Sequence, residues 1–257
     1  MGSTTDPPNT SSANGTGTNT SNNTSTPNDN DEDSQLPYWN VNLPPTLSTP
    51  TCPPFLLHLN EKDRRIIGTP DPLYIIESWP SVVSKINANR LDLFQRLPSD
   101  LRRYHEFCYN IKLNHGSVMN FILSERLGWE LPLQPKGTKP FEEEEDVKVL
   151  PNDWPYGLDK RIVHLVVWVK FELEADREKG DLTSEARGVV DGWVRQKFVE
   201  EGGLEKGRVV WFRNWTSLKS VKSVEHFHVM LFDPRRELVD GLTGGDTPLC
   251  ERVKLDI

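Results

Sequence analysis

The chain has 257 residues and a formal net charge of −8 at pH 7, with 38 acidic and 30 basic side chains. Nucleic-acid binding usually needs a basic face, so this charge argues against a nucleic-acid partner. It leaves room for a local basic pocket that holds a small phosphorylated ligand. Every apolar run is shorter than the roughly 20 residues that a membrane-spanning helix requires, and we expect no membrane association.

The cysteines and the N-terminus bear on the cellular compartment. Cys52, Cys108 and Cys250 are widely spaced and form no CxxC pair, so neither a disulfide framework nor a thiolate zinc site is predicted. The N-terminus has neither the basic nor the apolar segment of a secretory signal. We expect a cytoplasmic protein, with the nucleus as an alternative, and no cofactor.

Residues 1–50 are predicted to form a disordered tail. They consist mainly of Ser, Thr, Asn, Pro and Gly, with an acidic cluster at 29–33. Ordering such a segment costs backbone entropy and buries almost no apolar surface. The remaining residues, 51–257, are enough for a single folded domain with a substantial core.

The segment 60–130 is predicted to be mainly helical. Trp79-Pro80-Ser81 is typical of a helix start. Apolar residues at helical spacing then predict one helix over 98–112 and a second over 118–127, which Ser117 caps. A proline-rich break follows over 132–146. It ends in five consecutive acids, which we interpret as a solvated loop.

The second half of the chain shows strand signals. Residues 161–171, RIVHLVVWVKF, are dense in apolar residues and predict a central strand that is buried on both faces. The elements predicted from there on are a strand over 161–171, a helix that opens at 181–185 and runs to about 199, a strand over 208–213 and a strand over 223–232. This order predicts an α+β domain with an antiparallel sheet.

The last of these strands contains His226 and His228. Residues at i and i+2 of a strand point to the same face, so the two imidazoles should stand side by side. Phe227 and Val229 alternate with them and should face a core. The pair is therefore a candidate site for a nucleophile, a phosphate or a metal.

The segment Ser223–Met230, SVEHFHVM, resembles the histidine-triad (HIT) signature Q-S-V-x-H-φ-H-φ-H-φ-φ. The run HLVVWVK, which begins at His164, is similar to that superfamily's H-x-L-V-I-P-K strand, and 209–214 resembles its strand that ends in Asn. Three longer runs, PSDLRRY, NDWPYGLDKRIVHLVVWVKF and NWTSLKSVKSVEHFHVMLF, resemble the fungal N-acetylglucosamine-induced protein family. The resemblance implies a HIT-like antiparallel sheet with flanking helices over 150–235, preceded by a helical extension.

The resemblance also implies a nucleotidyl hydrolase or transferase that acts on a nucleotide or nucleotide-sugar. In histidine-triad enzymes the middle histidine attacks the α-phosphorus and forms a covalent nucleotidyl-histidine, and by motif position this residue is His228. His226 would orient the nucleophile or contact phosphate. Ser223 and Asn214 would donate hydrogen bonds to phosphate oxygens, and Lys222 would add positive charge.

The motif departs from the pattern at Met230, which stands in place of the third histidine. A methionine cannot donate a proton to a leaving group. A non-catalytic protein that binds nucleotides or sugar phosphates, or regulates the response to N-acetylglucosamine, is therefore the alternative function. A metal site on His226, His228 and His164 ranks last, because no carboxylate or thiolate partner lies at useful spacing.

Two further expectations follow. His164 opens a buried strand, so it is either a hydrogen-bonded core residue or one of the substrate-binding residues. The expected partner is a small phosphorylated ligand. A homodimer is also compatible with the sequence, although the helical extension could occupy the surface through which small triad proteins dimerise.

Overall fold

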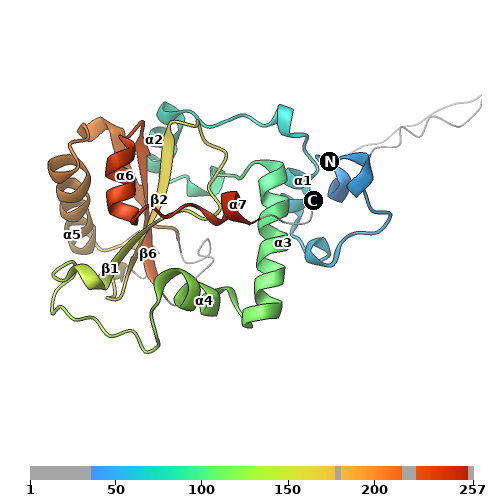
Figure 1. The fold of residues 1–257 in the computed structure, drawn as a ribbon. Coiled ribbons are helices and arrows are strands. Elements are labelled where there is room, and N and C mark those ends of the chain that lie inside the picture. The colour runs from blue at the N-terminus through green and yellow to red at the C-terminus, as the bar shows by residue number, and fades with distance from the viewer. Residues whose placement is uncertain (1–35, 177–180, 216–223, 254–257) are drawn as a thin grey trace, which may run out of the picture. The chain divides into compact units, whose positions relative to one another are not determined.

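The computed structural model describes residues 36–176, 181–215 and 224–253 (Figure 1). Its centre is a four-stranded antiparallel sheet with the strand order β1-β2-β6-β5. These strands are β1 (Val147–Pro151), β2 (Ile162–Val169), β5 (Val209–Phe212) and β6 (Glu225–Phe232). Two short strands, β3 (Ala175–Asp176) and β4 (Asp181–Leu182), pair separately.

The α-helices are α1 (Glu61–Ile67), α2 (Trp79–Asn87), α3 (Pro98–His115), α4 (Val118–Phe121), α5 (Ser184–Val194), α6 (Arg236–Thr243) and α7 (Leu249–Arg252). Two of them continue as π-helical segments, α4 through Ile122–Leu127 and α5 through Arg195–Glu201. Short 3-10 helices span Tyr38–Asn40, Pro45–Leu47, Pro54–Leu56, Asp71–Leu73, Leu91–Leu93, Glu144–Asp146 and Lys206–Arg208. The α+β class with an antiparallel sheet is thereby confirmed.

The two helices predicted before the sheet form for local reasons. Pro98 occupies the first turn of α3, where its missing N–H costs nothing. Gly116 ends this helix with φ of 75°, a conformation that glycine adopts without strain. The Ser117 hydroxyl then accepts a hydrogen bond from the Asn120 amide at 3.0 Å and caps α4. The predicted helices at 98–112 and 118–127 are confirmed.

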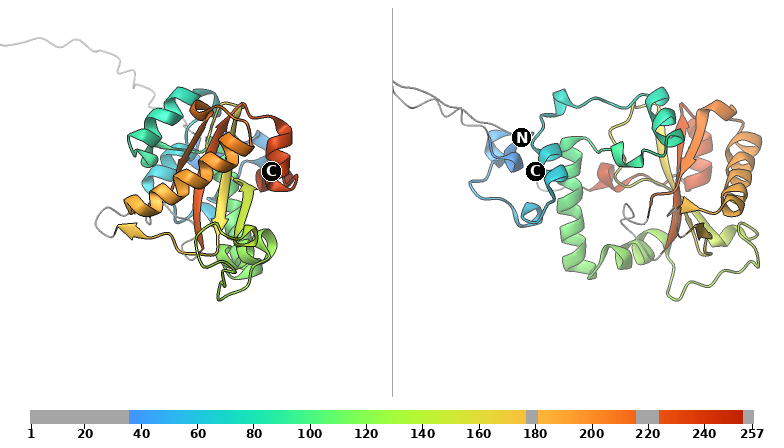
Figure 2. Two further views of the ribbon diagram at one scale, coloured as in Figure 1. Left: turned by 90° about the vertical axis from the view of Figure 1, so that its left-hand side faces the viewer. Right: turned by 180° about the vertical axis from the view of Figure 1, so that it is seen from behind.

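The two faces of the sheet are covered by different helices. Alternate residues such as Leu165, Val167 and Phe227 pack against α5 and α6. The opposite face carries His164, His226, His228 and Met230, and α2, α3 and α4 lie on that side (Figure 1, Figure 2). Because both faces are covered, β2 is buried along nearly its whole length, as predicted.

The folded part of the chain starts earlier than the predicted boundary at residue 50. Asn40 is buried, and its side chain exchanges two hydrogen bonds with the Thr49 backbone, at 2.9 and 3.0 Å. The Tyr38 hydroxyl donates to the Leu56 carbonyl oxygen at 2.9 Å. These contacts tie residues 36–50 to the helical region, so their assignment to the tail was wrong. The rest of the predicted tail, 1–35, lies outside the described residues.

The acidic run at 142–146 is not a fully solvated loop. Its first four residues are exposed, but Asp146 is only 1% exposed. Burial by itself would raise the pKa of the Asp146 carboxyl, whereas hydrogen bonds from the backbone of Gly137 and Lys136 and the charge of Lys170 hold this pKa below its usual value. Asp146, the last acid of the run, therefore links the proline-rich segment to the sheet through these hydrogen bonds and its ion pair with Lys170.

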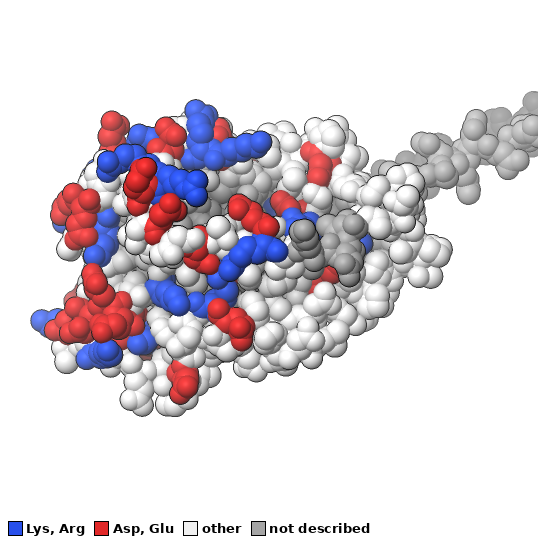
Figure 3. Space-filling model, in the orientation of Figure 1, with Lys and Arg blue, Asp and Glu red and all other residues white. Residues whose placement is uncertain are grey.

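Charged side chains are unevenly spread over the face drawn in Figure 3. They gather over the part of the molecule that contains α5 and α6, where acidic and basic groups alternate over short distances. Within the described residues, no helix is long and apolar enough to cross a bilayer.

Candidate functional site

The register of the sheet brings the histidines together. β2 and β6 pair so that His164 lies opposite Met230, Val166 opposite His228 and Trp168 opposite His226. His226 and His228 therefore share a face, as the strand period predicted, and His164 lies on this face diagonally across from His228.

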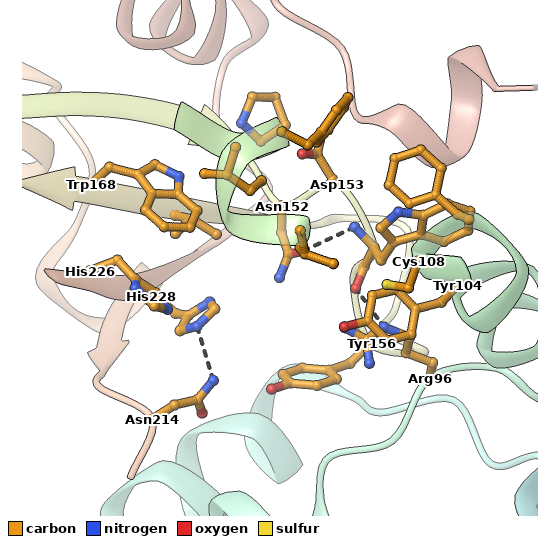
Figure 4. Close-up of a pocket in the computed structure, with 17 residues that line it drawn as sticks. Arg96, Tyr104, Cys108, Asn152, Asp153, Tyr156, Trp168, Asn214, His226 and His228 are labelled. Carbon is orange, nitrogen blue, oxygen red and sulfur yellow. Dashed lines mark hydrogen bonds between the residues drawn. The ribbon is translucent and has the colours of Figure 1, made fainter. Parts of the chain in front are cut away.

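His228 is buried and is held by a hydrogen bond at each ring nitrogen. Its Nδ1 lies 3.0 Å from His164 Nε2, and its Nε2 lies 3.1 Å from Asn214 Nδ2 (Figure 4). Because the Asn214 amide donates to Nε2, the His228 proton resides on Nδ1 and is donated to His164. This arrangement leaves His228 neutral, with the lone pair of Nε2 on the side of Asn214.

The environment of His164 fixes its role as an acceptor. Burial, assisted by the positive charge of Arg96, lowers the pKa of His164 from 6.5 to about 3. The imidazole is therefore neutral at physiological pH, and its Nε2 can accept the hydrogen bond that His228 Nδ1–H donates. Its ring also lies against the side-chain amide nitrogen of Asn152, which is 3.2 Å from Nε2.

His226 is oriented by a different contact. Its Nδ1 donates to the Val224 carbonyl oxygen at 2.8 Å, so Nε2 is the nitrogen that carries the lone pair. The ring lies against Trp168, with centroids 4.5 Å apart and planes inclined by 32°. A backbone carbonyl and an indole thus fix both the tautomer and the plane of this imidazole.

These side chains form one wall of a cavity of about 180 Å³ between the histidine face of the sheet and helices α3 and α4 (Figure 4). His226, His228 and Asn214 make its polar wall. Aromatic side chains dominate the remainder, and these are Tyr104, Phe107, Phe121, Trp154, Tyr156 and Trp168. Arg96, Asn152 and Asp153 add further polar groups to the lining, and polar groups that converge beside aromatic side chains in a hollow are typical of small-ligand sites.

The acidic group in the cavity wall, Asp153, forms an ion pair with Arg126. Arg126 donates to both of its carboxylate oxygens, at 2.8 and 3.0 Å, and also binds Asp246 at 2.6 Å. Burial raises the pKa of Asp153, although Arg126 opposes the rise. The group acts as a structural anchor, because the Leu249 amide also donates to it.

The basic group in the wall, Arg96, has no such counterion. Its Nε donates to the Trp154 carbonyl oxygen at 2.9 Å, and its guanidinium carbon lies 4.0 Å from the centroid of the Tyr104 ring. No carboxylate in the part of the chain that the structure describes lies within ion-pairing distance of it. Sequence reasoning missed Arg96 because it lies far from the histidine motif and in the helical region.

The residues proposed from the sequence separate into three groups. His226, His228 and Asn214 come together in the cavity wall. His164 lies behind His228 and does not line the cavity, so it acts on the site through His228 rather than by contact with a ligand. Ser223 and Lys222 lie outside the described residues.

Two further side chains close to the candidate residues are engaged elsewhere. Arg213, which precedes Asn214 in the chain, forms a bidentate pair with Glu225 at 2.9 and 3.0 Å. Met230 is fully buried in an apolar cluster with Val82 and Phe94. Across residues 36–176, 181–215 and 224–253, no three His, Cys, Asp or Glu side chains are grouped so as to hold a metal ion.

Two fungal proteins are similar to this chain. N-acetylglucosamine-induced protein 1 of Candida albicans is 27% identical over 186 residues, which are 65% of this chain and 73% of that protein. An uncharacterized protein of Saccharomyces cerevisiae is 30% identical over 160 residues, 61% of this chain and 79% of that one.

A solved structure and a family model extend these similarities. The crystal structure of HTC1 superposes with a TM-score of 0.52 and 25% identity, over 66% of this chain and 97% of HTC1. A family model described as "protein of unknown function (DUF3605)" matches residues 78–232, which include the described residues that line the cavity, from Arg96 to His228. The chain therefore belongs to the DUF3605 family.

Proposed function

We propose that the cavity binds a nucleotide or nucleotide-sugar and that His228 transfers its nucleotidyl group. The observation that supports this most directly is the 3.0 Å hydrogen bond between His228 Nδ1 and the neutral His164. Covalent catalysis needs a nucleophile that a neighbouring group holds in place, and His228 lies in the cavity wall with its Nε2 lone pair accepting a hydrogen bond from Asn214, which a ligand would displace.

The reaction has two steps. The Nε2 lone pair of His228 attacks the α-phosphorus, a P–N bond forms, and the bond from phosphorus to the leaving group breaks with its electrons on that group. Water or another acceptor then attacks phosphorus, loses a proton, and displaces the imidazole. The Asn214 amide, 3.1 Å from Nε2 before reaction, would turn its donor to a phosphoryl oxygen.

The HIT-like character of the core is part of this proposal. Its support is the signature around His226 and His228, together with the placement of His164 and Asn214 on either side of the middle histidine. The name of the Candida albicans relative links that protein to induction by N-acetylglucosamine. For this chain we propose a nucleotide-sugar as the first substrate class to try.

A binding protein without turnover is the second candidate. The observation in its favour is Met230, which is fully buried among apolar side chains and places no proton donor at the third position of the motif. Such a protein would keep the cavity and lose the chemistry. A ligand at 100 times its dissociation constant would then stabilise the fold by about 2.7 kcal/mol without being consumed.

The experiment is a turnover assay on a panel of UDP-sugars, dinucleoside polyphosphates and nucleoside phosphoramidates. Wild type, His228→Ala and His58→Ala are compared, and nucleoside monophosphate release is measured by chromatography. His58 is an exposed histidine outside the cavity and serves as the matched control. We expect release by wild type and His58→Ala, and at least a 10²-fold loss in His228→Ala.

The outcomes separate the two candidates. Equal release by all three proteins would refute nucleophilic catalysis by His228. No release by any protein, combined with saturable thermal stabilisation by one member of the panel, would establish the binding function in its place.

A further inference from the structure

We infer that Tyr156 is the proton donor of the reaction: its hydroxyl protonates the leaving group when His228 attacks phosphorus, and the phenolate then recovers the proton from water. The inference rests on the proposed function and adds a catalytic residue to it. It gives a side chain of the loop between β1 and β2 a role that the Met230 side chain cannot fill.

Tyr156 lies in the cavity wall beside the nucleophile. It lines the same cavity as His228, and its hydroxyl forms a hydrogen bond with the Asn214 side chain (Figure 4). Because Asn214 Oδ1 has no partner among the described residues, the Asn214 amide nitrogen makes this contact as well as the 3.1 Å contact to His228 Nε2. The phenol oxygen therefore accepts from Asn214, and its own proton can be donated to a ligand.

Packing holds the Tyr156 ring in one plane. Phe94 stacks on it with centroids 5.0 Å apart and planes inclined by 9°, and the His164 ring lies against it at 5.3 Å. The backbone beside it is also held, because the Gly157 amide donates to the Gln95 carbonyl oxygen at 3.0 Å. A proton donor that is already fixed in place loses little entropy when it meets its acceptor.

The charges around Tyr156 suit a group that gives up a proton and recovers it. Burial raises the pKa of the Tyr156 hydroxyl, so the group carries its proton at neutral pH. The positive charge of Arg96, whose guanidinium carbon is 5.9 Å from the ring centroid, and the hydrogen bond with Asn214 oppose this rise. Both contacts stabilise the phenolate once the proton has moved.

Two further side chains that carry a transferable proton, Tyr104 and Cys108, line the cavity from α3. They form a hydrogen bond with each other, and the Tyr104 ring supports the Arg96 guanidinium at 4.0 Å. Tyr156 instead shares the partner Asn214 with the nucleophile. Of the three, it is therefore the one that the structure links to the reacting nitrogen.

The two steps balance with Tyr156 as the carrier of one proton. His228 Nε2 forms the bond to the α-phosphorus, and the bond from phosphorus to the leaving nitrogen or oxygen breaks. The electron pair stays on the leaving atom, which takes the Tyr156 proton and leaves a phenolate. Water then attacks phosphorus and gives a proton to the phenolate, while the bond to the imidazole breaks and both side chains return to their starting states.

The test compares two leaving groups on the same nucleotide. Adenosine and uridine 5′-phosphates are each prepared as the p-nitrophenyl ester, whose leaving group departs as a stable anion, and as the morpholidate, whose amine must be protonated. Wild type, Tyr156→Phe and the control Tyr109→Phe are assayed, Tyr109 being 36% exposed on α3. We expect Tyr156→Phe to lose about 10²-fold or more in kcat on the morpholidates and to stay within a few-fold of wild type on the p-nitrophenyl esters.

The outcomes separate this inference from the proposed function. Losses of similar size on both leaving groups would make Tyr156 a positioning residue that acts through Asn214, and would overturn the inference while the proposed function stands. Unchanged turnover of the morpholidates by Tyr156→Phe would also overturn the inference alone. No release by wild type from any of these substrates would refute the inference and the proposed function together.

A measurement on wild type alone does not depend on the folding of a variant. Substituted phenyl esters of the same nucleotides, with leaving groups of increasing basicity, are assayed for kcat/KM. Because a donated proton offsets the charge on the departing oxygen, kcat/KM should fall only weakly along the series. A steep fall indicates a leaving group that departs without a proton, and would contradict the role of Tyr156.

Discussion

His164 shows how burial sets the protonation state of a single side chain. In the unfolded chain the His164 imidazole has a pKa near 6.5, whereas in the folded protein burial and the charge of Arg96 lower this pKa to about 3. Between these values the unfolded state binds one proton more than the folded state. Acid therefore favours unfolding, because each pH unit in this window removes about 1.4 kcal/mol of folding free energy.

We predict that His164→Asn reduces the pH dependence of stability below pH 6.5. The free energy of unfolding, measured by urea denaturation from pH 6.5 to 4, should fall less steeply than in wild type by about 1.4 kcal/mol per pH unit. The exposed control His58→Asn should keep the wild-type slope. An unchanged slope in His164→Asn would show that His164 is protonated in the folded protein.

For single residues, the sequence predicted that His226 and His228 share a face of the sheet, but it did not predict that Arg96 lies in the cavity wall. His226 and His228 share a face because a strand has a period of two, and that follows from their spacing alone. The partners of His228, which are His164 and Asn214, depend on strand register, and only the family resemblance brought them into the candidate set. Arg96 reaches the site through tertiary packing, for which neither spacing nor motif gave a signal.

Among the elements, the segment that continues α4 is joined to the rest of the fold by Arg126. Its side chain is 6% exposed and bridges Asp153, after β1, to Asp246, after α6. These three positions lie far apart in the sequence. The link keeps α4 against the sheet and so keeps the cavity closed on that side.

We predict that Arg126→Met destabilises the protein by about 3–5 kcal/mol, because it leaves the poorly solvated Asp153 carboxylate without a counterion and Asp246 with only Arg252, at 3.3 Å. Chemical denaturation measures this directly. Arg236→Met is the matched control, since the Arg236–Asp240 pair at 3.3 Å is exposed and should contribute less than about 1 kcal/mol. A loss in Arg126→Met no larger than in the control would show that the bridge does not hold α4.

The elements that the sequence missed are short. β1 is short and ends in Pro151, so its five residues give too little alternation to recognise. α6 is similarly brief and begins directly after a charged turn. The long helix α3 and the apolar strand β2 were predicted well because many residues of each contribute to one pattern.

On the scale of the whole molecule, the helices before the sheet complete its core. Val166 and Trp168 are covered by Ile122 and Leu123, and Met230 is covered by Val82. The helical region is therefore required to bury the histidine face, and the four-stranded sheet with α5 and α6 is only part of the folding unit.

We predict that a fragment of residues 147–253 does not fold cooperatively, because an apolar sheet face would be exposed to water. Circular dichroism should show no sharp thermal transition for this fragment. Deletion of residues 1–35 is the comparison, and it should leave the melting temperature unchanged, since it removes none of the described contacts. A sharp transition in the 147–253 fragment would show that the sheet and its second helical layer are stable alone.

The aromatic lining of the cavity has a practical consequence for spectroscopy. Trp168 lies 4.5 Å from His226, centroid to centroid, and Trp154 lines the same hollow. Indole emission responds to the polarity of its surroundings and to a nearby charged imidazole. The unlabelled chain thus carries its own optical reporter of occupancy, and a Trp168→Phe variant separates the signal at the histidines from that of the other indoles.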